Sequence, residues 1–106
     1  MSLYRGTTPT YTITFPNDID MTLATNIVVS LGNSSKNTLF EKKGNDLDVD
    51  VHTISFDLSQ EESLRFRDKF VVGQVNWLYP DGSKVKRACS NTFRFPVEDN
   101  MKDEVM

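Results

Sequence analysis

The stretch of sequence that decides the fold class runs from Phe70 to Lys84 and reads FVVGQVNWLYPDGSK. In an extended chain, large apolar side chains of this stretch fall on both faces. One face holds Val71, Val75, Trp77 and Tyr79, and the other holds Phe70, Val72, Gln74 and Leu78. The alternation predicts a strand from Phe70 to Tyr79, the longest in the chain, and the two apolar faces predict burial on much of both sides.

A turn follows this strand directly. Pro80 presets the backbone φ angle for the first turn residue, and Gly82 accepts a positive φ, as in a type I turn followed by a bulge. The residues from Lys84 onward are therefore expected to pair antiparallel with the stretch 75–79 and to form a hairpin.

Shorter alternating segments lie on both sides of this hairpin. They are typical of strands because β-branched and aromatic residues alternate with polar ones, and turn-forming residues separate them. The expected strands are Thr10–Phe15, Asn26–Leu31, Thr38–Lys43, Leu47–Val51, Ile54–Leu58 and Phe93–Val97. The expected turns and loops are Pro16–Asp18, Gly32–Ser35, Gly44–Asp46 and His52–Thr53, with an irregularity near Cys89–Asn91.

The segment after Leu58 carries a helix start signal. Ser59 and Glu62 have the spacing of a capping box, in which each side chain bonds the backbone N–H of the other residue. Helix-forming residues follow as far as Arg67, enough for about two turns. So short a helix needs tertiary support, so we expect Leu64 to pack on the sheet and the helix to cross between strands.

These segments together predict a mainly β fold. Seven or so short strands, hairpin turns and one short crossover helix are typical of a two-layer antiparallel β-sandwich, with a small barrel as the alternative. Residues 1–106 are expected to form a single domain, because this length supports one core. Residues 98–106 form a C-terminal tail, and residues 1–3 are typical of residues added for expression, with a natural start near Leu3 or Tyr4.

Composition excludes several classes of protein. The chain has 12 Lys and Arg against 15 Asp and Glu, a net charge of −3, which lacks the basic surface of a sequence-independent nucleic-acid binder. Its one cysteine, Cys89, excludes an intrachain disulfide and a cysteine-based zinc site. Neither a membrane-spanning stretch nor a signal peptide is recognisable, so we expect no membrane partner and no export by the general secretory route.

Two groups of residues contain side chains that could act in catalysis or bind a metal ion. Cys89 and His52 could form a nucleophile and base, but no third residue is recognisable to orient them, and a lone thiol usually packs as a small hydrophobe. No catalytic residue is therefore predicted, and the chain is not expected to be an enzyme. The stretch 46–51 begins like a calcium loop, but Val51 and Asp57 stand where such a loop needs Gly and Glu.

We therefore interpret the stretch 46–51 as a strand whose Leu and Val side chains point inward and whose Asp side chains point outward. No metal and no cofactor are expected.

Aromatic residues leave one other possibility open, a sugar-binding surface. Trp77, Tyr79 or Tyr11 would stack on sugar rings if they were exposed, although their strand spacing favours the core.

The C-terminal tail has an amphipathic pattern that favours packing against another surface. Val97, Met101 and Val105 recur every fourth residue, and Glu98 and Lys102 form a favourable helical pair. A segment this short is not a stable helix alone in water. It either docks on its own domain, docks on a neighbouring subunit or frays.

Three segments resemble a known group of proteins. They are Tyr4-Arg5-Gly6-Thr7-Thr8-Pro9-Thr10, Leu58-Ser59-Gln60-Glu61-Glu62-Ser63-Leu64-Arg65-Phe66, and Phe95-Pro96-Val97-Glu98-Asp99-Asn100-Met101-Lys102-Asp103-Glu104-Val105. With these segments the chain resembles small prophage proteins of low-GC Gram-positive bacteria, which are similar to the immunoglobulin-like N-terminal domain of phage baseplate upper proteins. The family ending often reads Lys-Asp-Gly, and here Glu104 takes the place of the Gly.

The resemblance implies an immunoglobulin-like sandwich that serves as a structural part of a phage or prophage tail or baseplate. Its expected partners are other tail and baseplate proteins and further copies of itself, and its expected location is the virion, after synthesis in the bacterial cytoplasm. The family has no enzymatic residues to carry over. The expected contact residues are Tyr4, Arg5, Val97, Met101 and Val105.

Overall fold

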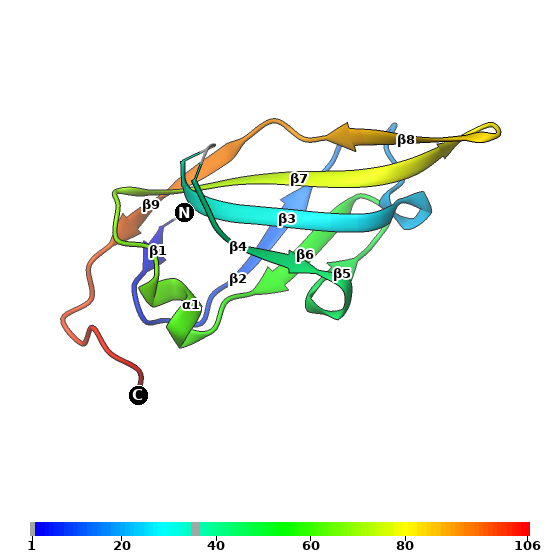
Figure 1. Cartoon of the computed structure of the whole chain (residues 1–106). Coiled ribbons are helices and arrows are strands. Elements are labelled where there is room, and N and C mark those ends of the chain that lie inside the picture. Colours follow the sequence, from blue (N-terminus) through cyan, green and yellow to red (C-terminus); the bar gives the residue numbers. More distant parts are fainter. Residues whose placement is uncertain (1, 35–36) are drawn as a thin grey trace.

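The computed structural model describes residues 2–34 and 37–106 and is mainly β (Figure 1). The strands are β1 (Leu3–Tyr4), β2 (Thr10–Thr14), β3 (Thr25–Ser34), β4 (Asn37–Lys43), β5 (Asp48–Val49), β6 (Thr53–Asp57), β7 (Phe70–Asp81), β8 (Lys84–Cys89) and β9 (Phe93–Glu98). The helices are α1 (Gln60–Leu64) and the short 3₁₀ turns η1 (Met21–Leu23) and η2 (Gly44–Asp46).

The strands form two sheets. The larger has the order β1-β9-β7-β3-β4, with β8 also paired to β7, and the smaller has the order β2-β6-β5. All strand pairs are antiparallel except β1 with β9, where Leu3 lies opposite Val97 in a parallel pair. The expectation of a wholly antiparallel arrangement is therefore wrong at β1, a strand too short to show an alternating pattern.

Strand β7 organises the larger sheet. It pairs with β3 along one edge, and its other edge is shared by β9 at Phe70–Gly73 and by β8 at Asn76–Asp81. The regular pairing along this edge of β7 is interrupted at Ser90, between β8 and β9. The Ser90 N–H donates to the Val75 carbonyl (2.9 Å), and the Ser90 hydroxyl accepts from the Val75 N–H (3.0 Å). The predicted irregularity near Cys89–Asn91 is confirmed.

The core lies between the two sheets. Tyr11 of β2 stacks on Phe95 of β9 at a ring distance of 4.5 Å, and Phe15 meets Trp77 edge-on at 5.5 Å. On β7, Val71 and Val75 are fully buried, whereas Phe70 on the opposite face is 38% exposed. Val72, Gln74 and Leu78 on the outer face are half-buried. The prediction that β7 is buried on much of both sides therefore holds for the inner face and only partly for the outer one.

The hairpin after β7 forms where it was predicted but with a tighter turn. Asp81 pairs directly with Lys84, so the loop has two residues, Gly82 and Ser83. Gly82 has a φ of 64°, which fits a type II′ turn, in which glycine takes the first central position. No bulge is needed, because this turn already matches the twist of the two strands.

Other expectations at strand ends need correction. Gly32 to Ser34 belong to β3 rather than to a loop, and Ser35 lies outside the described residues. Leu47 is buried as expected, but Val49 and Val51 are 40% and 41% exposed, because β5 is only two residues long and the chain then turns at Asp50. Of the bulge or tight turn expected at His52–Thr53, a tight turn forms, one residue earlier: the Asp50 N–H donates to the Thr53 carbonyl (2.8 Å) around Val51 and His52, and Thr53 begins β6.

Helix α1 begins with the predicted capping box. The Ser59 hydroxyl accepts from the Glu62 N–H (3.1 Å), and the Glu62 carboxylate accepts from the Ser59 N–H (2.9 Å). The helix has five residues, shorter than the two turns expected. It connects β6 to β7 and so crosses from one sheet to the other, and Phe66, just past its end, is fully buried whereas Leu64 is half-buried.

Candidate functional site

The most elaborate polar cluster of the chain surrounds Arg5. Only 8% of this residue is exposed, and its guanidinium donates three hydrogen bonds. The acceptors are the Phe66 carbonyl (3.1 Å), the Leu64 carbonyl (2.9 Å) and the Asp103 carboxylate (2.6 Å). The Arg5 carbonyl in turn accepts from the Asn100 side chain (3.0 Å). We call this group, Arg5 with Leu64, Phe66, Asn100 and Asp103, the terminal clasp.

The terminal clasp ties three distant segments together. The stretch after β1, the end of α1 and the tail after β9 meet at the end of the molecule where α1 lies (Figure 1). Nearby, the Ser63 hydroxyl donates to the Thr7 carbonyl (2.8 Å), and Leu3 is fully buried. Leu3 is therefore part of the fold, whatever the origin of the residues before it.

The predicted contact residues lie in different environments. Tyr4 is 54% exposed on β1, and Met101 and Val105 are exposed on the tail, so all three are available to a partner. Val97 is half-buried against the core and belongs to β9. Arg5 is not a surface residue, because the terminal clasp uses its side chain inside the chain.

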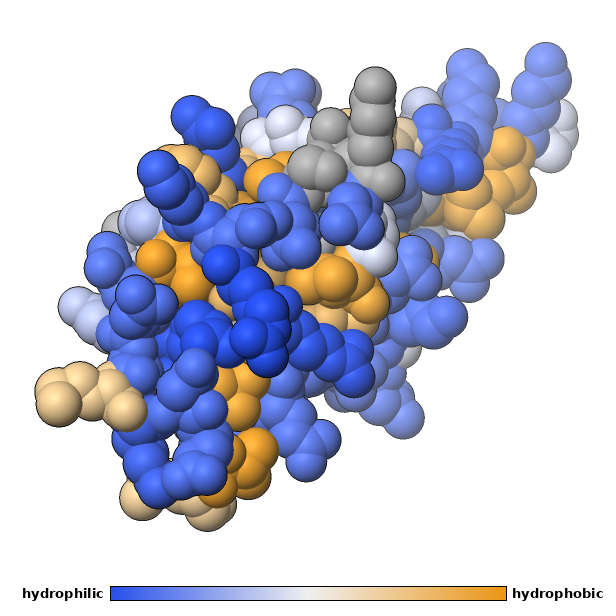
Figure 2. All heavy atoms as spheres, turned by 60° about the vertical axis from the view of Figure 1, so that its left-hand side comes forward, coloured by the Kyte–Doolittle hydropathy of each residue, from blue (hydrophilic) through white to orange (hydrophobic). Residues whose placement is uncertain are grey.

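The helical stripe expected in the tail does not form. Residues 99–106 are not helical, because Asn100 and Asp103 bond to Arg5 and the Met106 N–H donates to the Gln60 side chain (2.6 Å). Lys102 pairs with Glu104 rather than with Glu98. Figure 2 shows this side of the molecule largely covered by hydrophilic residues, with separate apolar patches between them. Of the alternatives left open, the tail docks on its own domain.

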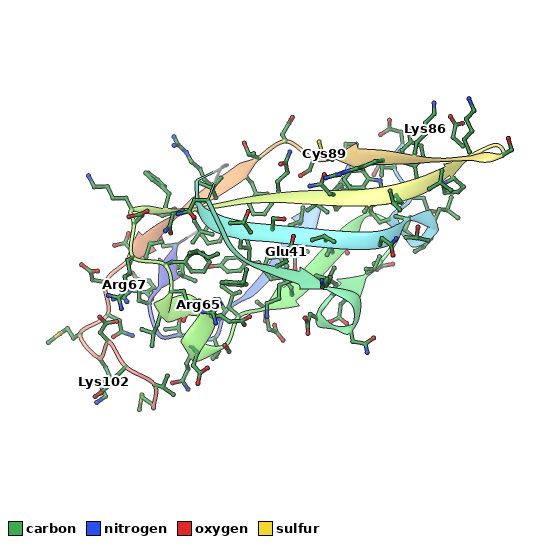
Figure 3. All side chains as sticks on the ribbon, in the orientation of Figure 1. Glu41, Arg65, Arg67, Lys86, Cys89 and Lys102 are labelled. Atoms are coloured by element: carbon green, nitrogen blue, oxygen red, sulfur yellow. The ribbon has the colours of Figure 1, made fainter. Side chains whose placement is uncertain are left out.

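His52 and Cys89, the two residues considered as a catalytic pair, do not lie in one site. His52 lies in the turn between β5 and β6, and its Nδ1 is 2.9 Å from the Ile19 carbonyl. Cys89 is exposed at the end of β8, on the other sheet (Figure 3). Within residues 2–34 and 37–106, no group of three or more His, Cys, Asp or Glu could hold a metal ion.

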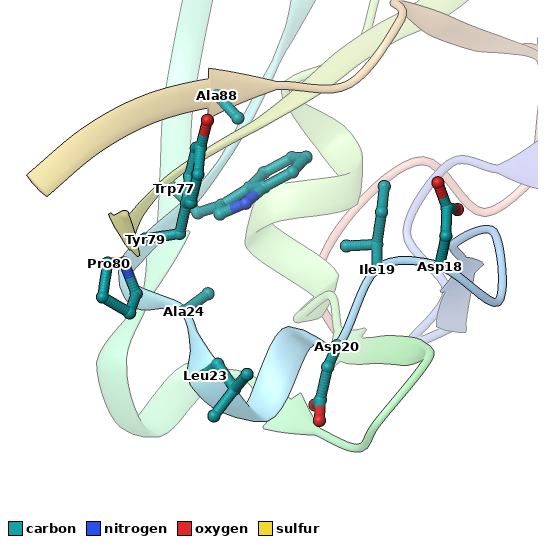
Figure 4. A pocket seen from close by; sticks show the side chains of 9 residues that line it. All are labelled: Asp18, Ile19, Asp20, Leu23, Ala24, Trp77, Tyr79, Pro80 and Ala88. Atoms are coloured by element: carbon teal, nitrogen blue, oxygen red, sulfur yellow. The ribbon is translucent and has the colours of Figure 1, made fainter. Parts of the chain in front are cut away.

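A shallow pocket of about 350 Å³ lies beneath the β7–β8 hairpin (Figure 4). Trp77, Tyr79 and Ala88 line one side, and the segment around η1 supplies Leu23 and Asp20. Trp77 is 7% exposed, Tyr79 is half-buried against the core, and Tyr11 is buried elsewhere. Of the three aromatic residues considered for stacking, Tyr79 alone is open enough to contact a ring.

Among the described residues, three titrating groups have pKa values shifted by their surroundings. Hydrogen bonds from the hydroxyl and N–H of Thr22 lower the pKa of Asp20. Burial raises the pKa of Tyr11 to about 12, and its hydroxyl finds no hydrogen-bond partner among the described residues. Burial also raises the pKa of Glu62, but hydrogen bonds from Lys42 and Ser59 and the charge of Lys42 outweigh it, so the net pKa is lowered. Lys42 Nζ lies 2.7 Å from the Glu62 carboxylate, a contact between β4 and α1 that the capping box alone did not predict.

Comparison with protein-family models, with curated proteins and with solved structures found no match for this chain. Among the described residues, no helix is long and apolar enough to cross a membrane.

Proposed function

We propose that this chain is a structural component of a phage or prophage tail or baseplate that acts through protein–protein contacts, and that its two sheets form an immunoglobulin-like sandwich. His52 and Cys89 lie far apart on different sheets. By contrast, the three segments that resemble the prophage proteins are joined in the terminal clasp. The partners proposed are other tail or baseplate proteins and further copies of the chain.

The strand order supports the immunoglobulin-like part of the proposal. Such sandwiches place strands B, E and D in one sheet and C, F and G in the other, and variable-type domains add C′ beside C. In chain order, β2, β6 and β5 correspond to B, E and D, and β3, β4, β7 and β9 correspond to C, C′, F and G. The paired cysteines of antibody domains are missing, so packing alone must stabilise this core.

The observation that carries the tail-protein proposal is the terminal clasp. The resemblance rests on three segments, around Arg5, around Leu64 and around Asp103, and the Arg5 side chain bonds to the other two. Sequence motifs whose residues bond to one another in a structural cluster indicate a structural role rather than a catalytic one. A family defined by such a signature shares a building block, which fits a role in assembly.

Co-expression with the products of the flanking genes tests the proposal. The complex is purified through a tag on the chain and weighed by native mass spectrometry. We expect a complex of fixed stoichiometry with at least one phage tail or baseplate protein. Flanking genes that encode no phage protein, or a chain that purifies free of phage tail proteins, would contradict the proposal.

A second candidate function, sugar binding, is favoured by the pocket beneath the β7–β8 hairpin. An aromatic side chain beside carboxylates is a common way to hold a sugar ring and its hydroxyls. Here Tyr79 supplies the ring on one side of the pocket, and Asp18 and Asp20 line the other side, with the Asp20 carboxylate directed away from the ring (Figure 4). The Asp20 carboxylate already accepts from the Thr22 N–H (2.9 Å), which leaves less of it for a ligand.

Titration with cell-wall oligosaccharides separates the two candidates. Trp77 lines the pocket, so its fluorescence reports binding there. Saturable binding that Tyr79→Ala abolishes, with unchanged thermal unfolding, would establish the sugar site. The leading proposal predicts no saturable change.

A further inference from the structure

The β7–β8 hairpin presents a free strand edge. Strand β8 pairs with β7 along one side, and no strand of the described chain lies along its other side. The hairpin projects beyond the three-stranded sheet in Figure 1, and Val85 on β8 is 68% exposed. An open edge with unpaired backbone groups is a template for a strand from another chain.

The charge of this edge limits what it can accept. Strand β8 carries Lys84, Lys86 and Arg87, and the carboxylate facing it across the hairpin is Asp81, 2.8 Å from Lys86 (Figure 3). Two copies of β8 placed side by side would bring cations against cations, which opposes pairing. The edge therefore favours a strand that carries carboxylates.

The same chain has such a strand at an edge of its other sheet. Strand β5 pairs with β6 on one side, and among the described residues no strand pairs with its other side. Three exposed carboxylates, those of Asp46, Asp48 and Asp50, surround it, and no ion pair to them is present in the described part of the chain. Val49, between Asp48 and Asp50, and Val51, after Asp50, are exposed beside these carboxylates, as Val85 is on β8.

We propose that the β8 edge of one copy pairs with the acidic β5 edge of a second copy. This rests on the proposed function, because it names the contact through which copies of an assembly protein would join. The two edges belong to different sheets of one chain. When two copies pair, one basic edge and one acidic edge of the pair therefore remain free. Such head-to-tail contacts continue into a ring or a filament.

The contact is small and largely electrostatic, so it is weak and sensitive to salt. Sedimentation velocity on the full chain measures it. We expect concentration-dependent association at about 0.05 M salt that weakens about tenfold or more at about 0.5 M salt. A wild-type chain that remains monomeric at all concentrations in low salt would overturn the proposal.

Charge reversal on each edge identifies the surfaces. The basic edge is reversed in Lys84→Glu/Arg87→Glu, and the acidic edge in Asp48→Lys/Asp50→Lys. Neither variant should associate alone, because each has two edges of like charge. An equal mixture should associate again, because each edge then meets its opposite on the other variant. Arg67→Glu/Lys69→Glu, with the same charge change at exposed residues away from both edges, should associate like the wild type.

Thermal unfolding of each variant must match that of the wild type, and the recovery in the mixture shows in addition that both variants are folded. Association that persists in both single-edge variants, or a mixture that stays monomeric, would overturn the proposal. Neither result touches the tail-protein proposal, which the co-expression experiment tests through other partners.

Discussion

The Arg5 guanidinium lies 2.6 Å from the Asp103 carboxylate, 98 positions later in the chain. Arg5 is almost fully buried, and Asp103 is half-exposed. The same guanidinium donates to the backbone carbonyls of Leu64 and Phe66, so one side chain joins the two ends of the chain to the segment between the sheets. The terminal clasp thus fixes the path of the tail after β9.

We predict that Arg5→Ala destabilises the fold by about 2–4 kcal/mol, because two backbone carbonyls lose a charged donor and a buried stem leaves a gap. Arg5→Lys should be only partly tolerated, since an ammonium cannot reproduce the planar fork that reaches three acceptors. Urea unfolding followed by circular dichroism measures both. The control, Arg67→Ala, removes an exposed arginine and should change stability by less than about 0.5 kcal/mol.

Asp103→Ala separates the ion pair from the rest of the terminal clasp. Because Asp103 is half-exposed, its removal should cost only about 0.5–1 kcal/mol. If Arg5→Ala unfolds at the same urea concentration as Arg67→Ala, the terminal clasp is not a stabilising unit.

Tyr11→Phe should change stability at neutral pH by less than about 1 kcal/mol, because the Tyr11 hydroxyl has no hydrogen-bond partner to lose among the described residues. At high pH the two proteins should diverge. The folded pKa of Tyr11 is raised to about 12, above the ordinary 10.0, so the wild type keeps full stability below about pH 10 and loses it as the pH rises toward 12.

Unfolding at about pH 8 and about pH 11 tests this difference. The Phe variant has no phenol at this position and should lose less stability than the wild type between the two. Equal losses would show that the Tyr11 hydroxyl reaches water.

Glu62→Gln should destabilise the fold near pH 7, and the difference from wild type should shrink on acidification. The folded pKa of Glu62 lies below its ordinary value of 4.5, so its charge stabilises the fold above that value. This contribution is lost as the pH falls through the folded pKa. Thermal unfolding at several pH values between about 7 and 3 measures it, and a difference that stays constant would contradict the role of the Lys42 contact.

Gly73→Ala should cost about 1–3 kcal/mol, because an added Cβ would lie 2.4 Å from the Phe93 ring. Gly73 lies on the inner face of β7, and the ring occupies the space that a side chain would fill. Phe93→Leu should therefore be less harmful in the Gly73→Ala background than in the wild type. Strictly additive losses, measured in a double-mutant cycle, would show that the ring and Gly73 are not in contact.

The fold elements that the sequence predicted correctly are those whose causes are local. The Ser59–Glu62 capping box needs only residues three apart, and the β7–β8 hairpin needs only Gly82 in its turn. The turn role expected for Pro80 is wrong, because Pro80 pairs with Val85 inside the hairpin. The alternating pattern also identified most strands, since it depends on neighbours two residues apart. Their extents were less well predicted, because pairing carries β3 beyond its apolar pattern as far as Ser34.

The terminal clasp could not be predicted, because the acceptors of Arg5 are 59, 61 and 98 positions away. The proposed resemblance singled out the same three segments, but a resemblance does not predict that segments touch. The four-residue spacing in the tail favoured a helix, but tertiary bonds from Asn100 and Asp103 fix an irregular path instead. Exposure of Val49 and Val51 likewise depends on the turn at Asp50 and not on the alternation.

The most direct test of a role in tail assembly is mass spectrometry of phage particles made by the complete gene cluster that encodes this chain. The account predicts that peptides of the chain are present in purified particles in a constant ratio to the other tail proteins, and that deleting its gene leaves tails incomplete. Complete, infectious particles that contain none of the chain would contradict the account.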